Sequence, residues 1–286
     1  MALDYDRLMS LKDEGMEYSY DFKDSILYAL SVGMARDPVN AQELRFAFEG
    51  VEAQKTLPSL ATVVSQGKPL PDNSCGWDFT KVLHAEQRLT VFRPIPAEAH
   101  IVVSQRVKDA YDRGEGKGAI ILTEVEARLK NTGELLYRLG NTIFARGDGG
   151  FGGPEGSGPK PHALPERAPD TSFEVVTTPN QALFYRLLGD LNYLHADPAI
   201  ATRAGFERPI LHGRCVFGIA CYSVTAAACD YDASRIREFN ARFSSVTYPG
   251  ETVVTDIWVD GDVISFRCRL KERDVVVLNN GYCRLA

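Results

Sequence analysis

The sequence predicts an α+β protein built from two halves of similar design, and three observations support this expectation. A segment rich in Gly and Pro, residues 147–170, divides the 286-residue chain near its middle. On either side of it, an apolar helical run is followed by β-type segments in the same order. Turn signals between these segments indicate antiparallel meanders. We therefore expect an N-terminal half at 1–146, a linker at 147–170 and a C-terminal half at 171–286.

The first half begins with a helical run at about residues 22–34. Four strand-like segments follow it, at 86–92, 100–111, 118–129 and 134–146. Pro94 and Pro96 separate the first two of these strands, since proline removes a donor from a sheet ladder. The sequence Lys-Asn-Thr-Gly at 130–133 joins the last two as a hairpin turn.

The second half repeats this plan with an apolar helical run at 211–228. Its strand-like segments are 237–246, 252–260, 262–271 and 275–286. Tyr248-Pro249-Gly250 takes the place of the proline-containing break in the first half, and Asp260-Gly261 is a strong hairpin signal.

An antiparallel sheet with one apolar face needs a cover. The run at 211–228 is apolar nearly all round and carries small residues such as Gly218 and Ala220, so it suits burial inside a curled sheet. Two such units can join edge to edge, which protects their edge strands. This arrangement is the double hot-dog, with two helices wrapped by one long antiparallel sheet. Two unrelated α+β domains are the alternative.

Composition limits the possible functions. Hydrophobic residues make up 44% of the chain, which is enough for a substantial core. The formal net charge of −6 argues against a general nucleic-acid binder. No apolar run is long enough to span a membrane, and the N-terminus is too charged for a signal peptide. The C-terminal Cys-Arg-Leu-Ala is not a peroxisomal address, so we expect a cytoplasmic protein.

The six cysteines form no Cys-x-x-Cys pair and no Cys/His spacing that suits zinc. We interpret them as reduced, buried, small apolar residues and expect neither a metal nor a cofactor. Gly147, Gly149 and Gly152 match the dinucleotide fingerprint formally. Because prolines follow and no helix opens there, we reject that interpretation.

The most informative stretch of the chain runs from Tyr185 to Gly213. Asp190, Asn192 and His195 fall within six residues of it. An acid and an imidazole so placed can hold one water between them, which is the arrangement of general acid–base catalysis. Gly-Asp-x-Asn is also ordinary turn chemistry, and a single histidine is more often structural. Together, these residues favour a catalytic site.

Neighbouring residues suggest supporting roles. Asp197 before Pro198 predicts a helix N-cap, with a second role in orienting His195. His212 and Gly213 precede the apolar helix, and the free backbone N–H groups of a first helical turn can bind an oxyanion. Tyr185 and Arg186 lie one turn before Asp190, where they either line the site or pack the preceding helix.

The stretch 185–213 resembles the hydratase 2 motif of MaoC-like (R)-specific enoyl-CoA hydratases. The resemblance is closest to the hydratase 2 unit of peroxisomal multifunctional enzyme type 2 and covers nearly the whole chain. Further segments that resemble this unit are 27–33, 46–50, 81–87, 112–118, 147–153 and 241–252. The family usually reads Gly-Asp-x-Asn-Pro-Leu-His, and Tyr193 replaces the proline here. This departure affects the stiffness of the loop more than its chemistry.

The resemblance implies a double hot-dog lyase of fatty acid β-oxidation, with one active site in the C-terminal half. Its N-terminal half would be non-catalytic and widened for bulky acyl chains. Asp190 and His195 would hold the water that adds to a trans-2-enoyl-CoA to give the (3R)-3-hydroxyacyl-CoA. Asn192 would orient them, and the Gly213 N–H would bind the thioester oxygen.

The resemblance also implies contacts to an acyl-CoA substrate and assembly into a homodimer. The implied substrate-binding residues are Glu49, His84, Ala85, Arg113, Tyr185, Arg186 and Phe243. A hot-dog acyl-CoA thioesterase, a 3-hydroxyacyl carrier-protein dehydratase and a non-catalytic acyl-binding subunit are the alternatives.

Overall fold

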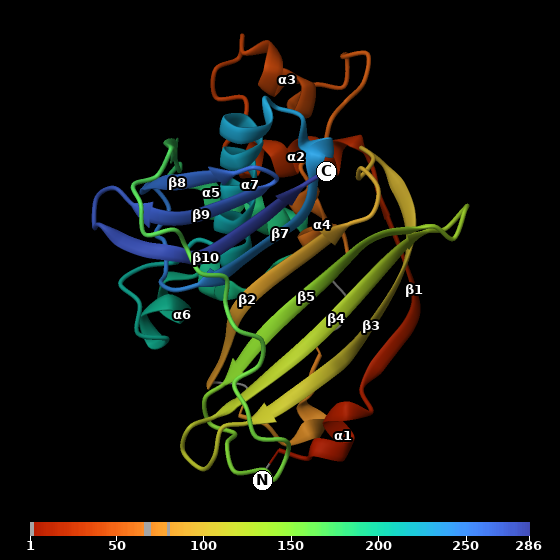
Figure 1. The fold of residues 1–286 in the computed structure, drawn as a ribbon, viewed down its shortest axis with the longest axis vertical. Helices are drawn as coiled ribbons and strands as arrows, with labels where there is room; N and C mark the ends of the chain where they lie inside the picture. The colour runs from red at the N-terminus through yellow and green to blue at the C-terminus, as the bar shows by residue number, and fades with distance from the viewer. Residues whose placement is uncertain (1–2, 66–69, 79–80) are drawn as a thin grey trace.

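A computed structural model describes residues 3–65, 70–78 and 81–286, and Figure 1 shows its course. One antiparallel sheet of ten strands runs through it in the order β1-β3-β4-β5-β2-β7-β10-β9-β8-β6. Its first five strands are β1 (Lys12–Tyr20), β2 (Val82–Val91), β3 (Ala99–Asp112), β4 (Ala119–Leu129) and β5 (Leu135–Ala145). The other five are β6 (Thr171–Val176), β7 (Ile236–Phe243), β8 (Thr252–Asp260), β9 (Val263–Leu270) and β10 (Val275–Leu285).

The two halves repeat one strand order. Read from each outer edge inwards, the first half runs β1-β3-β4-β5-β2 and the second runs β6-β8-β9-β10-β7. The halves meet where β2 pairs with β7, with Gln87 opposite Ala241. The predicted α+β double hot-dog is therefore confirmed. The edge strands β1 and β6 were not expected from the sequence. Each shows only a short apolar alternation, at Met16, Tyr18 and Tyr20 in β1 and at Phe173 and Val175 in β6, and most of their other residues are exposed.

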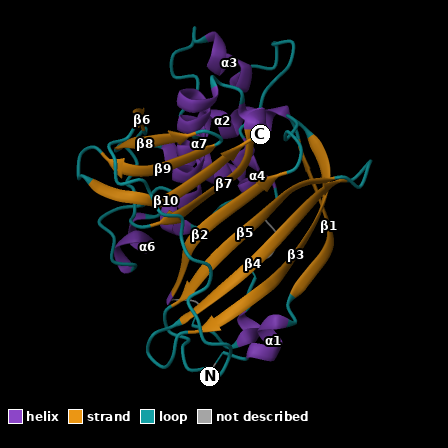
Figure 2. Ribbon diagram, viewed as in Figure 1, coloured by secondary structure: helices purple, strands orange, loops and turns teal. Residues whose placement is uncertain are grey.

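Helices gather on one face of the sheet (Figure 2). The helices are α1 (Tyr5–Met9), α2 (Phe22–Ser31), α3 (Ala41–Ala47), α4 (Ala61–Val64), α5 (Gln181–Tyr185), α6 (Pro198–Arg203) and α7 (Gly213–Cys229). Short 3₁₀ turns include η4 (Arg186–Leu188) and η5 (Tyr193–His195). No helix in the described ranges is long and apolar enough to cross a membrane.

Helix α7 is the centre of the core. Every residue from Cys215 to Thr225 is buried, as the apolar run predicted. The helix packs against β6, β7, β8 and β9 of its own half. Its counterpart in the first half, α2, has 10 residues against 17 in α7. Asp21 and Asp24 close the N-terminus of α2 with reciprocal hydrogen bonds of a capping box.

The linker is a strap across the outer face of the sheet. Apart from an isolated bridge between Asp112 and Glu155, residues 147–170 form neither helix nor strand. The ring of His162 lies 2.8 Å from the Ser265 hydroxyl, and the indole of Trp258 donates to the Arg167 carbonyl at 2.8 Å.

The glycine-rich start of this strap wraps around a protein carboxylate. The Asp112 side chain accepts the backbone N–H groups of Gly114, Gly150 and Gly152, each at 2.8 Å. The glycine-rich segment 147–152 therefore binds a carboxylate of the protein itself, that of Asp112. This contact gives a physical reason to set aside the dinucleotide interpretation.

Gly218 allows α2 of the first half to pack directly on α7 of the second. A Cβ atom at Gly218 would lie 2.6 Å from both the Tyr28 hydroxyl and a Val32 methyl group. Both neighbours are buried, so neither can move away cheaply.

We expect Gly218→Ala to destabilise the protein although alanine favours helix. Overpacking costs roughly 1–3 kcal/mol, whereas the gain in helix propensity is about 1 kcal/mol. The midpoint of urea unfolding should fall. As a control, Ala227→Gly at an exposed position of the same helix measures propensity alone. A Gly218→Ala protein more stable than wild type would contradict this packing.

Candidate active site

A single loop between η4 and α6 carries the acid and the imidazole. Gly189 ends η4 with a φ of 114°, a conformation that glycine adopts without strain. The Asn192 side chain accepts the Leu194 N–H at 3.0 Å and so opens the turn η5, which ends at His195. The Asp197 carboxylate caps α6 through the N–H groups of Ala199 and Ile200, as predicted.

Two histidines stack at the base of this loop. The rings of His195 and His212 lie 3.7 Å apart between centroids, at 28°. His195 Nδ1 lies 2.8 Å from the Ile210 carbonyl, and His212 Nε2 lies 3.2 Å from the Asp190 carbonyl. Because a carbonyl only accepts, each of these nitrogens carries its ring's proton. Nε2 of His195 is therefore left with a free lone pair.

The Asp190 carboxylate comes close to these rings. One ligand atom each from Asp190, His195 and His212 lies within 4.8 Å of the others. That gap suits a single water, since two O–H···N/O hydrogen bonds of about 2.8 Å span it. A metal ion could use the same spacing. However, the remaining His212 nitrogen is sealed from solvent and has no partner, so we interpret the group as an acid–base site.

Burial keeps these histidines neutral. Desolvation lowers the pKa of His195, although the Ile210 carbonyl and the Asp190 charge oppose this effect. Desolvation, followed by the neighbouring His195, lowers the pKa of His212 to about 4. A neutral imidazole with a free lone pair is the form that a general base needs.

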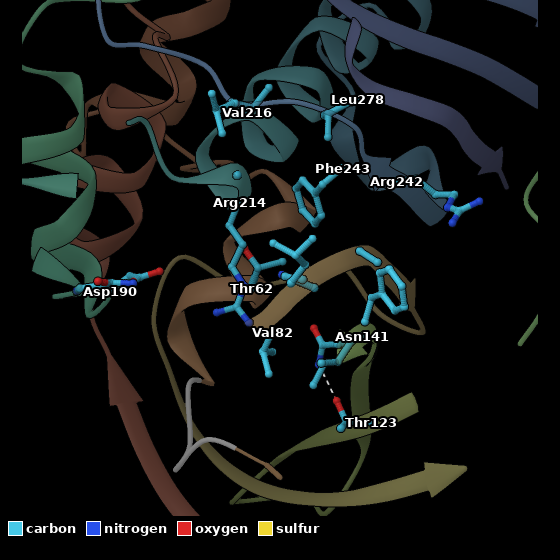
Figure 3. A pocket seen from close by; sticks show the side chains of 18 of the residues that line it. Thr62, Val82, Thr123, Asn141, Asp190, Arg214, Val216, Arg242, Phe243 and Leu278 are labelled. Carbon is cyan, nitrogen blue, oxygen red and sulfur yellow. Dashed lines mark hydrogen bonds between the residues drawn. The ribbon is translucent and has the colours of Figure 1, made fainter. Parts of the chain in front are cut away.

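A cavity of about 820 Å³ opens beside the loop and reaches into both halves (Figure 3). Asp190 and His195 line it together with Gly213, the first residue of α7. No described acceptor pairs with the Gly213 N–H, which therefore offers a donor at the positive end of α7. The other C-terminal lining residues are Asn192, Leu194, Ile210, Leu211, Arg214, Val216, Arg242, Phe243, Ser244, Ser245, Val246, Thr247, Val277 and Leu278.

The other wall comes from the first half. Its lining residues include Thr62, Ser65, Trp77, Val82, His84, Ala85, Gln105, Thr123, Val125, Leu139, Asn141, Ile143 and Phe144. The His84 ring packs on Phe243 with 4.8 Å between centroids. Phe243 in turn lies where a Cβ at Gly213 would come within 3.1 Å of it, so glycine keeps this approach open. Burial, followed by the charge of Arg214, lowers the pKa of His84 to about 3.

The structure brings most of the expected site residues together, with five exceptions. One is Asp197, whose carboxylate caps α6 and makes no hydrogen bond to His195 among the described residues. Tyr185 is fully buried beneath the histidines, 4.9 Å from the His212 ring, and does not line the cavity. Arg186 is half-buried and also lies outside the lining. Arg113 is exposed, with its guanidinium 5.3 Å above the ring of Phe144, so it lies near the cavity wall without forming part of it.

Glu49 is placed away from the cavity. It lies in an exposed turn after α3, because the helix ends at Ala47 and Phe48 is already extended. The buried acid of this segment is Glu43, which accepts the Tyr222 hydroxyl and the Ala35 N–H, each at 2.6 Å. The partnered carboxylate of this segment therefore lies six residues before the one that the resemblance implied.

Arg214 and Asn141 also line the cavity, although neither was expected from the sequence. Arg214 could have been noticed as a charge in the first turn of an otherwise apolar helix. Asn141 lies within a strand, and the sequence around it does not indicate that it faces the cavity.

Comparisons with known proteins agree over the whole chain. Residues 18–147 match the family described as MFE-2 hydratase 2 N-terminal domain, and residues 161–280 match the MaoC like domain. Enoyl-CoA hydratase ChsH3 of Mycobacterium tuberculosis is 37% identical over 98% of both chains. Probable enoyl-CoA hydratase 2 of Dictyostelium discoideum is 35% identical over 98% of this chain and 96% of its own.

Solved structures give the same result. A MaoC-like dehydratase from Phytophthora capsici superposes with a TM-score of 0.87 at 29% identity, covering 99% of both chains. Peroxisomal multifunctional enzyme type 2 of Drosophila melanogaster superposes with a TM-score of 0.81 at 31% identity. This match covers 96% of this chain and 48% of the Drosophila protein.

The histidine stack predicts specific ring nitrogen signals. At pH 7, ¹⁵N NMR should show His195 protonated at Nδ1 and His212 at Nε2. Because burial lowers both pKa values, His195 should take up a second proton only below its ordinary value near 6.5, and His212 only near pH 4. The variants His195→Gln and His212→Gln assign the signals. Titration of either ring at or above pH 6.5 would contradict the arrangement.

Proposed function

The chain belongs to the MaoC-like hydratase 2 family, and from this membership we propose that it hydrates trans-2-enoyl-CoA reversibly to (3R)-3-hydroxyacyl-CoA. The observation that carries the proposal is the approach of Asp190 and His195 to within 4.8 Å at the wall of a large cavity. A free N–H at Gly213 lies in the same wall. These three groups supply what conjugate addition of water requires.

In the proposed mechanism, Asp190 and His195 hold one water over the double bond. The water oxygen bonds to C3 while one of its protons passes to Nε2 of His195. The π electrons of the C2–C3 bond move towards the thioester oxygen, where the Gly213 N–H stabilises the developing charge. The imidazolium then gives its proton to C2 on the same face, which completes a syn addition. Asp190 accepts the second O–H of the water and fixes its position, and Asn192 supports the turn that aligns both groups.

We propose that the C-terminal half carries the chemistry and residues 1–146 contain the acyl chain. In support, the cavity passes the inner faces of β4 and β5 at Val125, Leu139 and Ile143. The first half also has only the short α2 where the second has α7. His84, Ala85 and Phe243 would hold the thioester end of CoA, with Arg113 farther along it. Residues 147–170 would serve as the connection.

Assembly into a homodimer is part of the proposal. Leu183, Phe184, Leu187 and Leu191 are 48–62% exposed, although each is a large apolar residue. They lie within nine residues on α5, η4 and the catalytic loop. Clustered exposed apolar side chains commonly mark an interface between proteins. We propose that this group meets its copy in a second chain.

We propose the cytoplasm as the compartment. All six cysteines are free and buried, which fits a reducing environment. The peroxisome is the alternative, because relatives include Enoyl-CoA hydratase 2, peroxisomal, of Arabidopsis thaliana.

The catalytic pair can be tested with isosteric variants. Asp190→Asn and His195→Gln should each lower kcat for crotonyl-CoA by about 100-fold to 10,000-fold. His195→Gln removes the proton acceptor, Asp190→Asn removes the charged hydrogen-bond acceptor that positions the water, and both nearly keep the size of the side chain. Loss of the conjugated enoyl absorbance gives the rate, and circular dichroism checks the fold. Asp6→Asn on exposed α1 serves as a matched control. Full activity in either catalytic variant would refute the assignment.

The product separates this proposal from its alternatives. Chiral chromatography should identify the (3R) alcohol, and a thiol reagent should detect no free CoA. A (3S) product, or release of CoA as in a thioesterase, would contradict the mechanism. A strong preference for carrier-protein thioesters over CoA thioesters would indicate a biosynthetic dehydratase.

The dimer is tested by placing a charge in the apolar group. Leu187→Glu should shift the mass found by light scattering from two chains to one, since two carboxylates would face each other at the interface. Val39→Glu at an exposed apolar site outside the group is the control and should leave the mass unchanged. A wild-type protein with the mass of one chain would contradict the proposed assembly.

A further inference from the structure

Arg214 is a cation without a counter-ion in the cavity. It is the second residue of α7, directly after Gly213, and its side chain extends into the cavity between Asp190 and Asn141 (Figure 3). Among the described residues, it forms no ion pair and donates no side-chain hydrogen bond. Within the described ranges, Asp190 is the only acid in the lining, and its carboxylate forms no ion pair with Arg214.

Placing this charge in the cavity costs hydration free energy. A half-buried cation loses hydration and needs an anion or several acceptors in exchange. Its field reaches the neighbouring groups, where it opposes protonation of the His84 ring and contributes to the low pKa of that group. A cavity meant only for an alkyl chain would be better served by leucine at this position.

The wall near Arg214 is polar as well. Asn141 on β5 donates to the Thr123 hydroxyl on β4 at 2.9 Å, and both residues face the cavity. Gln105, Thr62 and Ser65 complete this part of the lining. Polar groups in an acyl-binding cavity lose hydration without return when an alkyl chain fills it, so this wall fits a substrate that carries polar atoms there.

The anion belongs to the acyl part of the substrate. Arg214 follows Gly213, whose N–H is the proposed donor to the thioester oxygen. The phosphate groups of CoA are separated from the thioester by the whole pantetheine arm, so a side chain that starts at the thioester cannot reach them. The acyl chain, in contrast, would leave the thioester into the cavity that Arg214 lines.

We propose that the preferred substrate is a trans-2-enoyl-CoA whose acyl chain ends in a carboxylate a few carbons beyond C3, bound by Arg214. This inference rests on the proposed hydratase function and names its substrate class. The guanidinium presents two parallel N–H donors that match a carboxylate, which makes such pairs strong and specific. Asn141 and Thr123 would accept or donate further hydrogen bonds to the same group.

The experiment compares substrates of equal length with and without the charge. The probes are trans-2-hexenoyl-CoA and the mono-CoA thioester of trans-2-hexenedioic acid, with eight- and ten-carbon pairs to find the best length. For wild type, kcat/KM should be higher for the carboxylated member. In Arg214→Leu the ratio between the two substrates should fall about 10-fold to 100-fold, the loss of a charged hydrogen bond. Arg214→Lys should keep an intermediate ratio.

Two controls make the result decisive. Arg203→Leu removes an exposed positive charge on nearby α6 and should leave the ratio unchanged. Binding of the unreactive adipoyl-CoA and hexanoyl-CoA, measured by calorimetry, gives the same comparison without turnover. Arg214→Leu should lose the preference for adipoyl-CoA while circular dichroism remains unchanged.

Other outcomes overturn the inference. If Arg214→Leu lowers kcat/KM equally for both substrates, Arg214 acts on the CoA part or the thioester, and the proposal is wrong. A wild-type preference for the neutral chain at every length would also contradict the proposal. If wild type hydrates no enoyl-CoA but still prefers adipoyl-CoA, the hydratase proposal fails and the carboxylate site stands.

Discussion

The structure depends on a helix that is buried on all sides while its first turn remains open to a cavity. Burial of α7 from Cys215 to Thr225 fixes its axis within the curved sheet. The same burial holds His212 under the loop that carries Asp190 and His195, and it presents Gly213 to the cavity. The stack of His195 on His212 then sets the height of the loop above the helix. Asp190, His195 and the proposed oxyanion donor Gly213 thus take their positions from a single packed element.

Much of this arrangement could be predicted because it is written in local patterns. Turn residues and the repeated order of elements predicted the two meanders, and the apolar run predicted α7 within a few residues. The close spacing of Asp190, Asn192 and His195 predicted that they act as a unit. A short loop keeps neighbours in sequence near each other in space, so the candidate site was accessible to sequence reasoning.

The features that could not be predicted from the sequence depend on contacts between segments far apart in the chain. The sequence near Glu49 cannot reveal that α3 ends at Ala47, or that Tyr222 on α7 selects Glu43 as the buried acid. The edge strands β1 and β6 each pair with a single neighbour, β3 and β8 respectively, and these neighbours lie far away in the sequence. Likewise, the stack between His195 and His212 requires the fold of the whole segment that separates them.

The pairing of β2 with β7 makes the ten strands one continuous surface. Separation of the two halves would expose a long row of unpaired amide and carbonyl groups on β2 and β7. Such unpaired strand edges promote aggregation. Because both halves belong to one chain, they are always present in a one-to-one ratio. Mutations can therefore specialise one half while the other half remains attached to it.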